Sequence, residues 1–127
     1  MKQDTKERVQ FFRKKISDNN VLIDAYKAQV EVLDECINKL NAAIEDIEDA
    51  FVNASFLSRY YIDEELWYGA GKADFEEELI PAYESSAIHF RDAISGKLEA
   101  VENKKRHICC EIANLEMENF LYNFFLN

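Results

Sequence analysis

The strongest constraint on the fold is a heptad repeat of apolar residues that begins at Val9. Two sets of residues each recur every seventh position, and together they form one seam. The first set is Val9, Ile16, Ile23, Val30, Ile37, Ile44 and Phe51, and the second is Phe12, Asn19, Tyr26, Leu33, Leu40, Ile47 and Ala54. This spacing predicts a long helix packed at coiled-coil geometry, with a length of roughly 65 Å from Val9 to Phe51 at ~1.5 Å per residue.

Asn19 is the polar exception in this seam, and it lies in the run Ser17-Asp18-Asn19-Asn20. These residue types prefer helix caps and turns, so the run could mark a weak point in the helix. However, the heptad phase passes through it without a shift, which favours a continuous helix. A polar residue at a seam position can also fix the register of two helices by bonding across their interface.

A second helical repeat follows Pro81. Its apolar residues are Ala87, Ile94, Leu98, Val101, Ile108, Ile112 and Leu115, with Arg91 and Lys105 interrupting the pattern. We expect this helix over about 73–119, with a kink near Pro81 because proline lacks the backbone N–H. An apolar C-terminal tail, residues 120–127, follows it. Gly96 weakens the helix, or it permits another helix to approach closely.

The charge pattern predicts that the two helices are antiparallel. If the chain reverses near Trp67, residues whose numbers sum to roughly 134 to 142 lie opposite each other. The basic run 104–106 then meets Glu31, Asp34 and Glu35, and the basic run 13–15 meets Glu116 and Glu118. Arg91 and Lys97 face the acidic stretch 45–49 in the same register. We therefore expect an all-α protein, a single helical hairpin domain over 1–127, with helix 1 at about 5–57 and a tip at about 64–72.

The predicted tip contains the W-x-G tripeptide of Trp67 and Gly69, followed by Phe75, with the small residues Ala70 and Ala73 between. This hairpin resembles the WXG (ESAT-like) proteins of type VII secretion in Gram-positive bacteria, and most closely the YwqH-like branch that accompanies LXG toxins. The resemblance implies that Trp67, Gly69 and Phe75 form an export or recognition tip. It also implies a helical partner, either the N-terminal domain of an LXG toxin or another WXG-like protein.

One departure from the family pattern concerns the export signal. WXG proteins frequently carry Tyr-x-x-x-Asp/Glu after the second helix, and the C-terminal tail here contains no such match. The resemblance therefore favours a targeting factor or chaperone that binds another substrate carrying the signal. The alternative is a homodimeric structural coiled-coil adaptor unrelated to secretion.

More apolar surface is present than one hairpin can cover. Extra apolar residues flank the seam at Phe11, Val21, Leu22, Ala25, Val32 and Cys36, and again at Cys109, Ala113, Met117 and Phe120. Stripes of this width are typical of three- or four-helix bundles, so we expect a homodimer, a heterodimer or a helical segment of a larger protein. The predicted partner-binding residues are Phe12, Tyr26, Leu33, Ile37, Leu40, Ile108, Ile112, Leu115, Phe120, Tyr122, Phe124 and Phe125. The C-terminal tail either folds back near Phe11 and Phe12 or stays exposed for a partner.

Other function classes receive little support. A net charge of −10 disfavours nucleic acid and anionic membrane surfaces. No signal peptide or membrane-spanning stretch is evident, so we expect synthesis in the cytoplasm, three reduced cysteines, and any export to proceed by a route that reads no cleaved signal. The family resemblance implies that this route is type VII secretion. His107 with Cys109 and Cys110 lacks a fourth metal ligand at normal spacing. No nucleophile or phosphate-loop motif is present either, so we expect no metal, no cofactor and no enzymatic activity.

Overall fold

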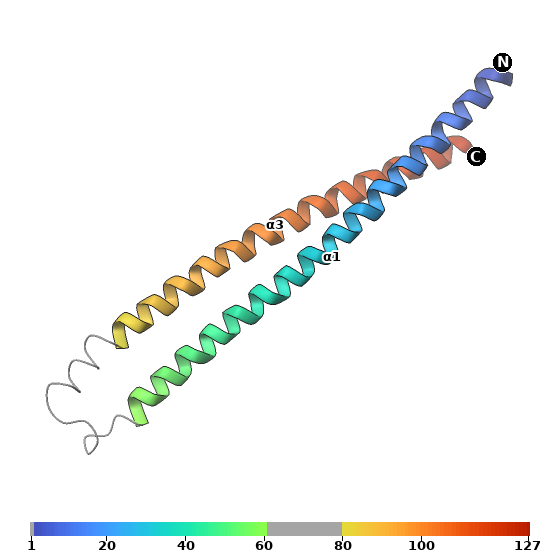
Figure 1. Ribbon diagram of the computed structural model, residues 1–127. Coiled ribbons are helices and arrows are strands. Elements are labelled where there is room, and N and C mark those ends of the chain that lie inside the picture. The colour runs from blue at the N-terminus through green and yellow to red at the C-terminus, as the bar shows by residue number, and fades with distance from the viewer. Residues whose placement is uncertain (1, 61–79) are drawn as a thin grey trace. The chain divides into compact units, whose positions relative to one another are not determined.

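The computed structural model describes residues 2–60 and 80–127, which form two helices. Helix α1 spans Lys2–Tyr60 and helix α3 spans Ile80–Leu126 (Figure 1). The two helices pack against each other as a hairpin, and no strand occurs in these two ranges. The all-α hairpin predicted from the heptads is therefore confirmed. The predicted tip, with Trp67, Gly69 and Phe75, lies outside the described residues.

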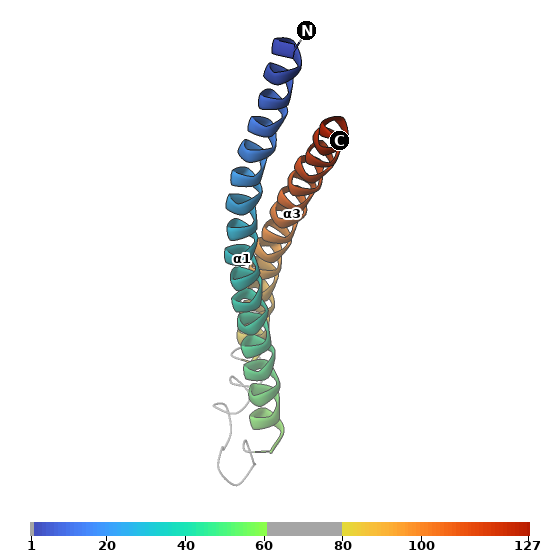
Figure 2. The ribbon, with the colours of Figure 1, turned by 90° about the vertical axis from the view of Figure 1, so that its right-hand side faces the viewer.

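The chain divides into two units, each of which contains part of both helices. The first unit comprises Met1–Cys36 and Val101–Asn127, and the second comprises Ile37–Ala100. In the first unit, the opening turns of α1 project past the C-terminal end of α3 in both views (Figures 1 and 2). This offset follows from the register, because Phe12 already lies beside Tyr122 and Phe125, near the end of the chain.

In the first unit, the seam of α1 turns toward α3. Asn19 and Ile23 are buried, with 7% and 6% exposure, while Phe12, Ile16 and Tyr26 are half-buried. Residues between them on the outer side of the helix are exposed, as expected when one stripe of a helix is covered. The seam predicted for this part of α1 is confirmed.

The seam of α3 extends further than the sequence pattern suggested. Ile108 is buried, with 5% exposure, and half-buried residues follow it at heptad spacing. They are Ile112, Leu115, Asn119, Tyr122 and Leu126. The last three fall in or beside the segment predicted as a tail. The heptad repeat is hard to recognise there in the sequence, because Asn119 is polar and the neighbouring positions are also Phe or Leu.

In the second unit, the half-buried positions also follow the two seams. On α1 they include Ile37, Leu40, Ile44 and Ile47, and on α3 they include Ala87, Arg91, Ile94 and Leu98. Arg91 thus occupies a seam position, as its interruption of the repeat indicated. Its guanidinium lies 3.6 Å from the Asp92 carboxylate on the same helix. Arg91 therefore forms its ion pair with Asp92, whereas the charge pattern favoured the acidic stretch 45–49.

The helix boundaries differ from the predicted ones. Helix α1 runs from Lys2 to Tyr60, longer at both ends than the predicted 5–57. Helix α3 continues to Leu126 instead of ending at residue 119, and the Asn127 N–H still donates to the Asn123 carbonyl at 3.1 Å. The segment 120–126 is therefore helical, because its seam residues pack on α1. Pro81 lies in the first turn of α3, where a missing N–H costs no helical hydrogen bond.

Candidate functional site: an interaction surface

A polar cluster fixes the register of the first unit. The Asn19 side-chain amide donates to Glu118 Oε2 at 3.2 Å and to Asn119 Oδ1 at 3.1 Å. Asn119 Nδ2 in turn donates to Asn20 Oδ1 at 3.0 Å. A slip of the helices by one turn would leave the buried Asn19 amide without these acceptors, which carries a free-energy cost. The sequence allowed Asn19 to bond with polar residues across the seam, and the structure shows these bonds.

An ion pair supports the same register further along. Lys105 Nζ lies 2.6 Å from Asp34 Oδ1, joining the basic run 104–106 to the acidic residues of α1. The hydrogen bond and the charge of Asp34 raise the pKa of Lys105 above its ordinary value. Both side chains are partly exposed, at 37% and 47%, so the pair contributes more to register than to stability.

Aromatic rings close the end of the first unit where the two chain termini lie. The Phe12 ring centroid is 5.5 Å from that of Tyr122 and 5.8 Å from that of Phe125. Phe11 and Phe124 extend the row, at 5.8 Å from Phe12 and 5.9 Å from Phe125 respectively. We call these five residues the aromatic end cluster. The C-terminal segment continues α3 as a helix and combines the two arrangements considered for it: Tyr122 and Phe125 contact Phe12, while Phe120, Leu121 and Phe124 stay exposed.

The opposite side of the same two turns of α3 is apolar and exposed. We call Phe120, Leu121, Phe124 and Phe125 the outer face of α3; their exposed fractions are 65%, 46%, 68% and 64%. Phe120, Leu121 and Phe124 lie away from α1 because Asn119, Tyr122 and Leu126 occupy the covered side of these turns. Phe125 lies at the edge of this face, where its ring also stacks on Phe12 of α1. Residues 119–126 contain no charged side chain. Large contiguous apolar surface of this kind marks an interaction site.

The predicted partner-binding residues therefore separate into two groups. Phe120, Phe124 and Phe125 are exposed on the outer face of α3. The others are buried or half-buried in the seams of the hairpin: Phe12, Tyr26, Leu33, Ile37, Leu40, Ile108, Ile112, Leu115 and Tyr122. Heptad spacing alone could not separate these groups, because it finds apolar stripes without showing which stripe the chain itself covers. Leu121 was missed, although its position between Phe120 and Phe124 in an apolar run was an available signal.

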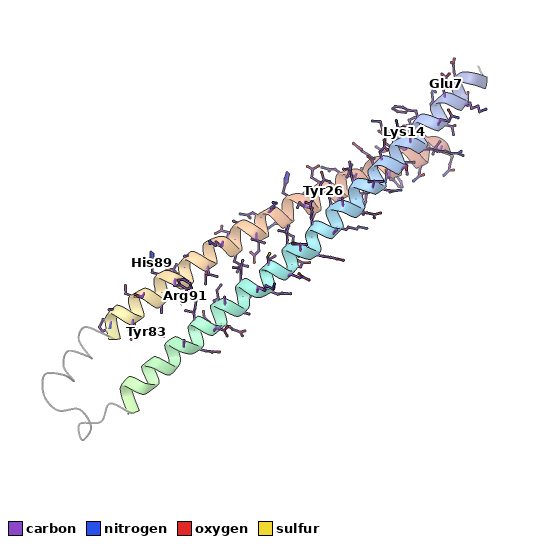
Figure 3. All side chains as sticks on the ribbon, viewed as in Figure 1. Glu7, Lys14, Tyr26, Tyr83, His89 and Arg91 are labelled. Carbon is purple, nitrogen blue, oxygen red and sulfur yellow. The ribbon has the colours of Figure 1, made fainter. Side chains whose placement is uncertain are left out.

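A second exposed apolar surface lies on α1. Phe11, Val21, Leu22 and Val32 are 53%, 68%, 44% and 60% exposed. Basic side chains accompany Phe11 in the sequence of α1: they are Lys14, which Figure 3 labels, and Lys15. Lys15 Nζ is 5.6 Å from the Phe11 ring centroid. This contact is a cation–π geometry. Further along α1, a shallow groove between the helices is lined by Ala28, Gln29, Val32, Leu33, Lys104 and Ile108.

Groups that could support chemistry are sparse in the described part of the chain. Residues 2–60 and 80–127 contain no cluster of three or more His, Cys, Asp or Glu side chains placed to hold a metal ion. Cys36, Cys109 and Cys110 are exposed free thiols. Within these same ranges, neither helix has a stretch long and apolar enough to cross a membrane.

Comparison with known proteins returned no match: no family model, no curated protein and no solved structure is significantly similar to this chain.

Proposed function

We propose that this chain is a non-enzymatic adaptor that binds a helical partner through the outer face of α3. The observation that carries the proposal is the exposure of Phe120, Phe124 and Phe125 on a helix whose other side already packs on α1. At about 25 cal/mol per Å² of apolar area, covering aromatic side chains of this size contributes several kcal/mol to binding. A helix is the best complement, because the face is a straight strip along two turns.

We further propose that the partner belongs to type VII secretion, with the N-terminal domain of an LXG toxin as the leading candidate. The support is the W-x-G tripeptide of Trp67 and Gly69, placed between the two helices of a hairpin. The adaptor would be made in the cytoplasm and would act as a targeting factor or chaperone for that partner. In this proposal, Trp67, Gly69 and Phe75 form the surface that the secretion machinery recognises.

Affinity capture from the source cell tests partner binding. The intact chain is expected to retain a larger protein with a helical N-terminal domain. A variant carrying Phe120→Ser and Phe124→Ser is expected to lose that protein, because both changes remove exposed apolar area without touching the seams. Phe90→Ser is the matched control, since Phe90 is a similarly exposed phenylalanine (62%) on α3 in the second unit. Equal capture by all three proteins would contradict the proposal.

Substitution of Trp67 separates binding from export. Trp67→Ala is expected to leave the captured complex intact and to stop secretion of the partner, measured as partner in the culture medium. Normal secretion by this variant would remove the support for a recognition role of the tip. Loss of the complex itself would assign Trp67 to partner binding instead.

A further inference from the structure

We propose that the partner helix of this chain is basic, with lysine or arginine on both sides of its apolar stripe. This inference rests on the function proposed above and names the chemistry of the partner that binds to α3. Its basis is the charge that borders the apolar surface of α3. The residues of this surface and of its borders all belong to the first unit.

The outer face of α3 continues toward the middle of the helix as a longer uncharged strip. We call it the outer strip of α3, and its residues are all exposed: Cys110, Ala113, Met117, Phe120, Leu121 and Phe124. Met117 is 61% exposed, similar to Phe120 and Phe124. This spacing keeps the side chains on one side of α3 over about four turns, roughly 20 Å. A straight apolar strip of this length accommodates one amphipathic helix lengthwise.

Acidic side chains border the outer strip of α3 on both sides. Glu111 and Glu118 are seven positions apart and lie along one edge of the strip, and Glu116 lies along the other. Glu116 and Glu118 are exposed, and Glu111 is half-buried. Between residues 108 and 126 these three carboxylates are the only charged side chains. The borders of the strip therefore carry negative charge and no positive charge.

The basic residues of α1 do not neutralise these carboxylates. The charge pattern of the sequence placed the basic run 13–15 near Glu116 and Glu118. In the structure Phe12 lies beside Tyr122, so this run lies nearer the end of α3. The hydrogen-bond register of the hairpin thus leaves the acidic borders available to a partner.

The contacts of the three carboxylates agree with this. Glu118 accepts a hydrogen bond from Asn19. Within residues 2–60 and 80–127, neither Glu111 nor Glu116 forms an ion pair. The groove that runs beside Phe120 has a net negative charge, because its charged lining residues are Asp24, Lys27 and Glu116.

These borders select a basic helix over the other occupants of an apolar surface. Lysine or arginine beside the apolar stripe of the partner lies against carboxylates of opposite sign. A second copy of the same strip sets like charges against each other, and an anionic lipid surface is repelled for the same reason. Arg106 lies one turn before the strip. The basic positions of the partner therefore lie beside residues 111–118, and its uncharged part covers Phe120 and Phe124.

Three designed peptides of equal length test this chemistry on the full chain. Each forms a helix with the same leucine and alanine stripe, and they differ only in the residues that flank the stripe: lysine, glutamine or glutamate. Fluorescence anisotropy of the labelled peptide measures binding. The lysine-flanked peptide is expected to bind about tenfold more tightly than the glutamine-flanked one, because exposed charge pairs each add a modest gain. The glutamate-flanked peptide is expected to bind most weakly, and high salt should reduce these differences.

Removing the border charges should abolish the preference for lysine. A variant with Glu111→Gln, Glu116→Gln and Glu118→Gln is expected to bind the lysine-flanked and glutamine-flanked peptides equally. Glutamine at position 118 keeps an acceptor for the Asn19 amide, and unchanged binding of the glutamine-flanked peptide shows that the variant is folded. The matched control changes the net charge equally but on α1, and it should keep the preference. It replaces three exposed glutamates by glutamine: Glu35, Glu45 and Glu48.

The outcomes separate this inference from the proposed function. If the glutamine-flanked peptide binds and the lysine-flanked one binds no more tightly, helix binding stands and a basic partner is excluded. If the control on α1 also loses the preference, the attraction comes from the overall charge, which overturns the inference. If no peptide binds, both proposals fail. They also fail if the strip instead binds phosphatidylglycerol vesicles, measured by sedimentation, or a second copy of the chain, measured by light scattering.

Discussion

Replacing Asn19 by alanine tests whether the polar cluster in the seam stabilises the hairpin. Asn19 is 7% exposed and donates two hydrogen bonds, to Glu118 and to Asn119. A hydrogen bond contributes about 0.5–1.5 kcal/mol net, and the half-buried Asn119 carbonyl would lose a partner. Glu118 is exposed and can bind water instead. We therefore expect Asn19→Ala to lower the free energy of unfolding by about 2 kcal/mol.

The assay is urea unfolding followed by circular dichroism, with Asn20→Ala as the matched control. Asn20 is an exposed neighbour that accepts one hydrogen bond from Asn119, so its loss should cost about 0.5 kcal/mol or less. A double-mutant cycle with Asn119→Ala should give a coupling energy of about 1 kcal/mol between the two seam residues. Equal destabilisation by Asn19→Ala and Asn20→Ala would refute the reasoning, because burial would then make no difference.

Three further predictions follow from single contacts. Gly96→Ala should stabilise the chain by about 1 kcal/mol, measured by urea unfolding, because an added Cβ meets no atom within 4 Å and alanine favours the helix; destabilisation would mean that another helix approaches there. Phe12→Ala should cost about 2 kcal/mol because Phe12 contacts two rings on α3, whereas exposed Phe124→Ala should change stability by less than about 0.5 kcal/mol; equal effects would contradict the aromatic packing. Because Asp34 raises the pKa of Lys105, the stabilisation from this pair is complete below the ordinary lysine value near 10.5 and is lost as the pH rises through the raised value. The stability difference between wild type and Asp34→Asn should therefore disappear at strongly alkaline pH, and a difference independent of pH would exclude the ion pair as its cause.

The sequence by itself determined the helices and the way in which the first unit pairs. The heptad period of α1 specifies which side of the helix is covered, and every seam position from Val9 to Ile47 is buried or half-buried. The register of the two helices could also be predicted from the sequence. Only a few alignments of α1 with α3 bring opposite charges together and give the polar seam residue a partner. The contacts of Lys105 with Asp34, and of Asn19 with Asn119, both fall in the predicted range. A helix that packs along its whole length repeats its apolar residues at a fixed spacing, and this spacing is visible in the sequence.

Only the tertiary structure decided which apolar residues remain available to a partner. Phe12 and Phe124 look alike in the sequence, yet Phe12 packs against Tyr122 and Phe125 while Phe124 is 68% exposed. Likewise, Arg91 lies beside Asp92 on its own helix, where the charge pattern favoured the acidic stretch of α1. The physical reason is that burial depends on where the opposite helix lies and how far it extends. The hydrophobicity of a side chain sets how much free energy its burial contributes. The packing of α1 on α3 determines which side chains are buried within one chain.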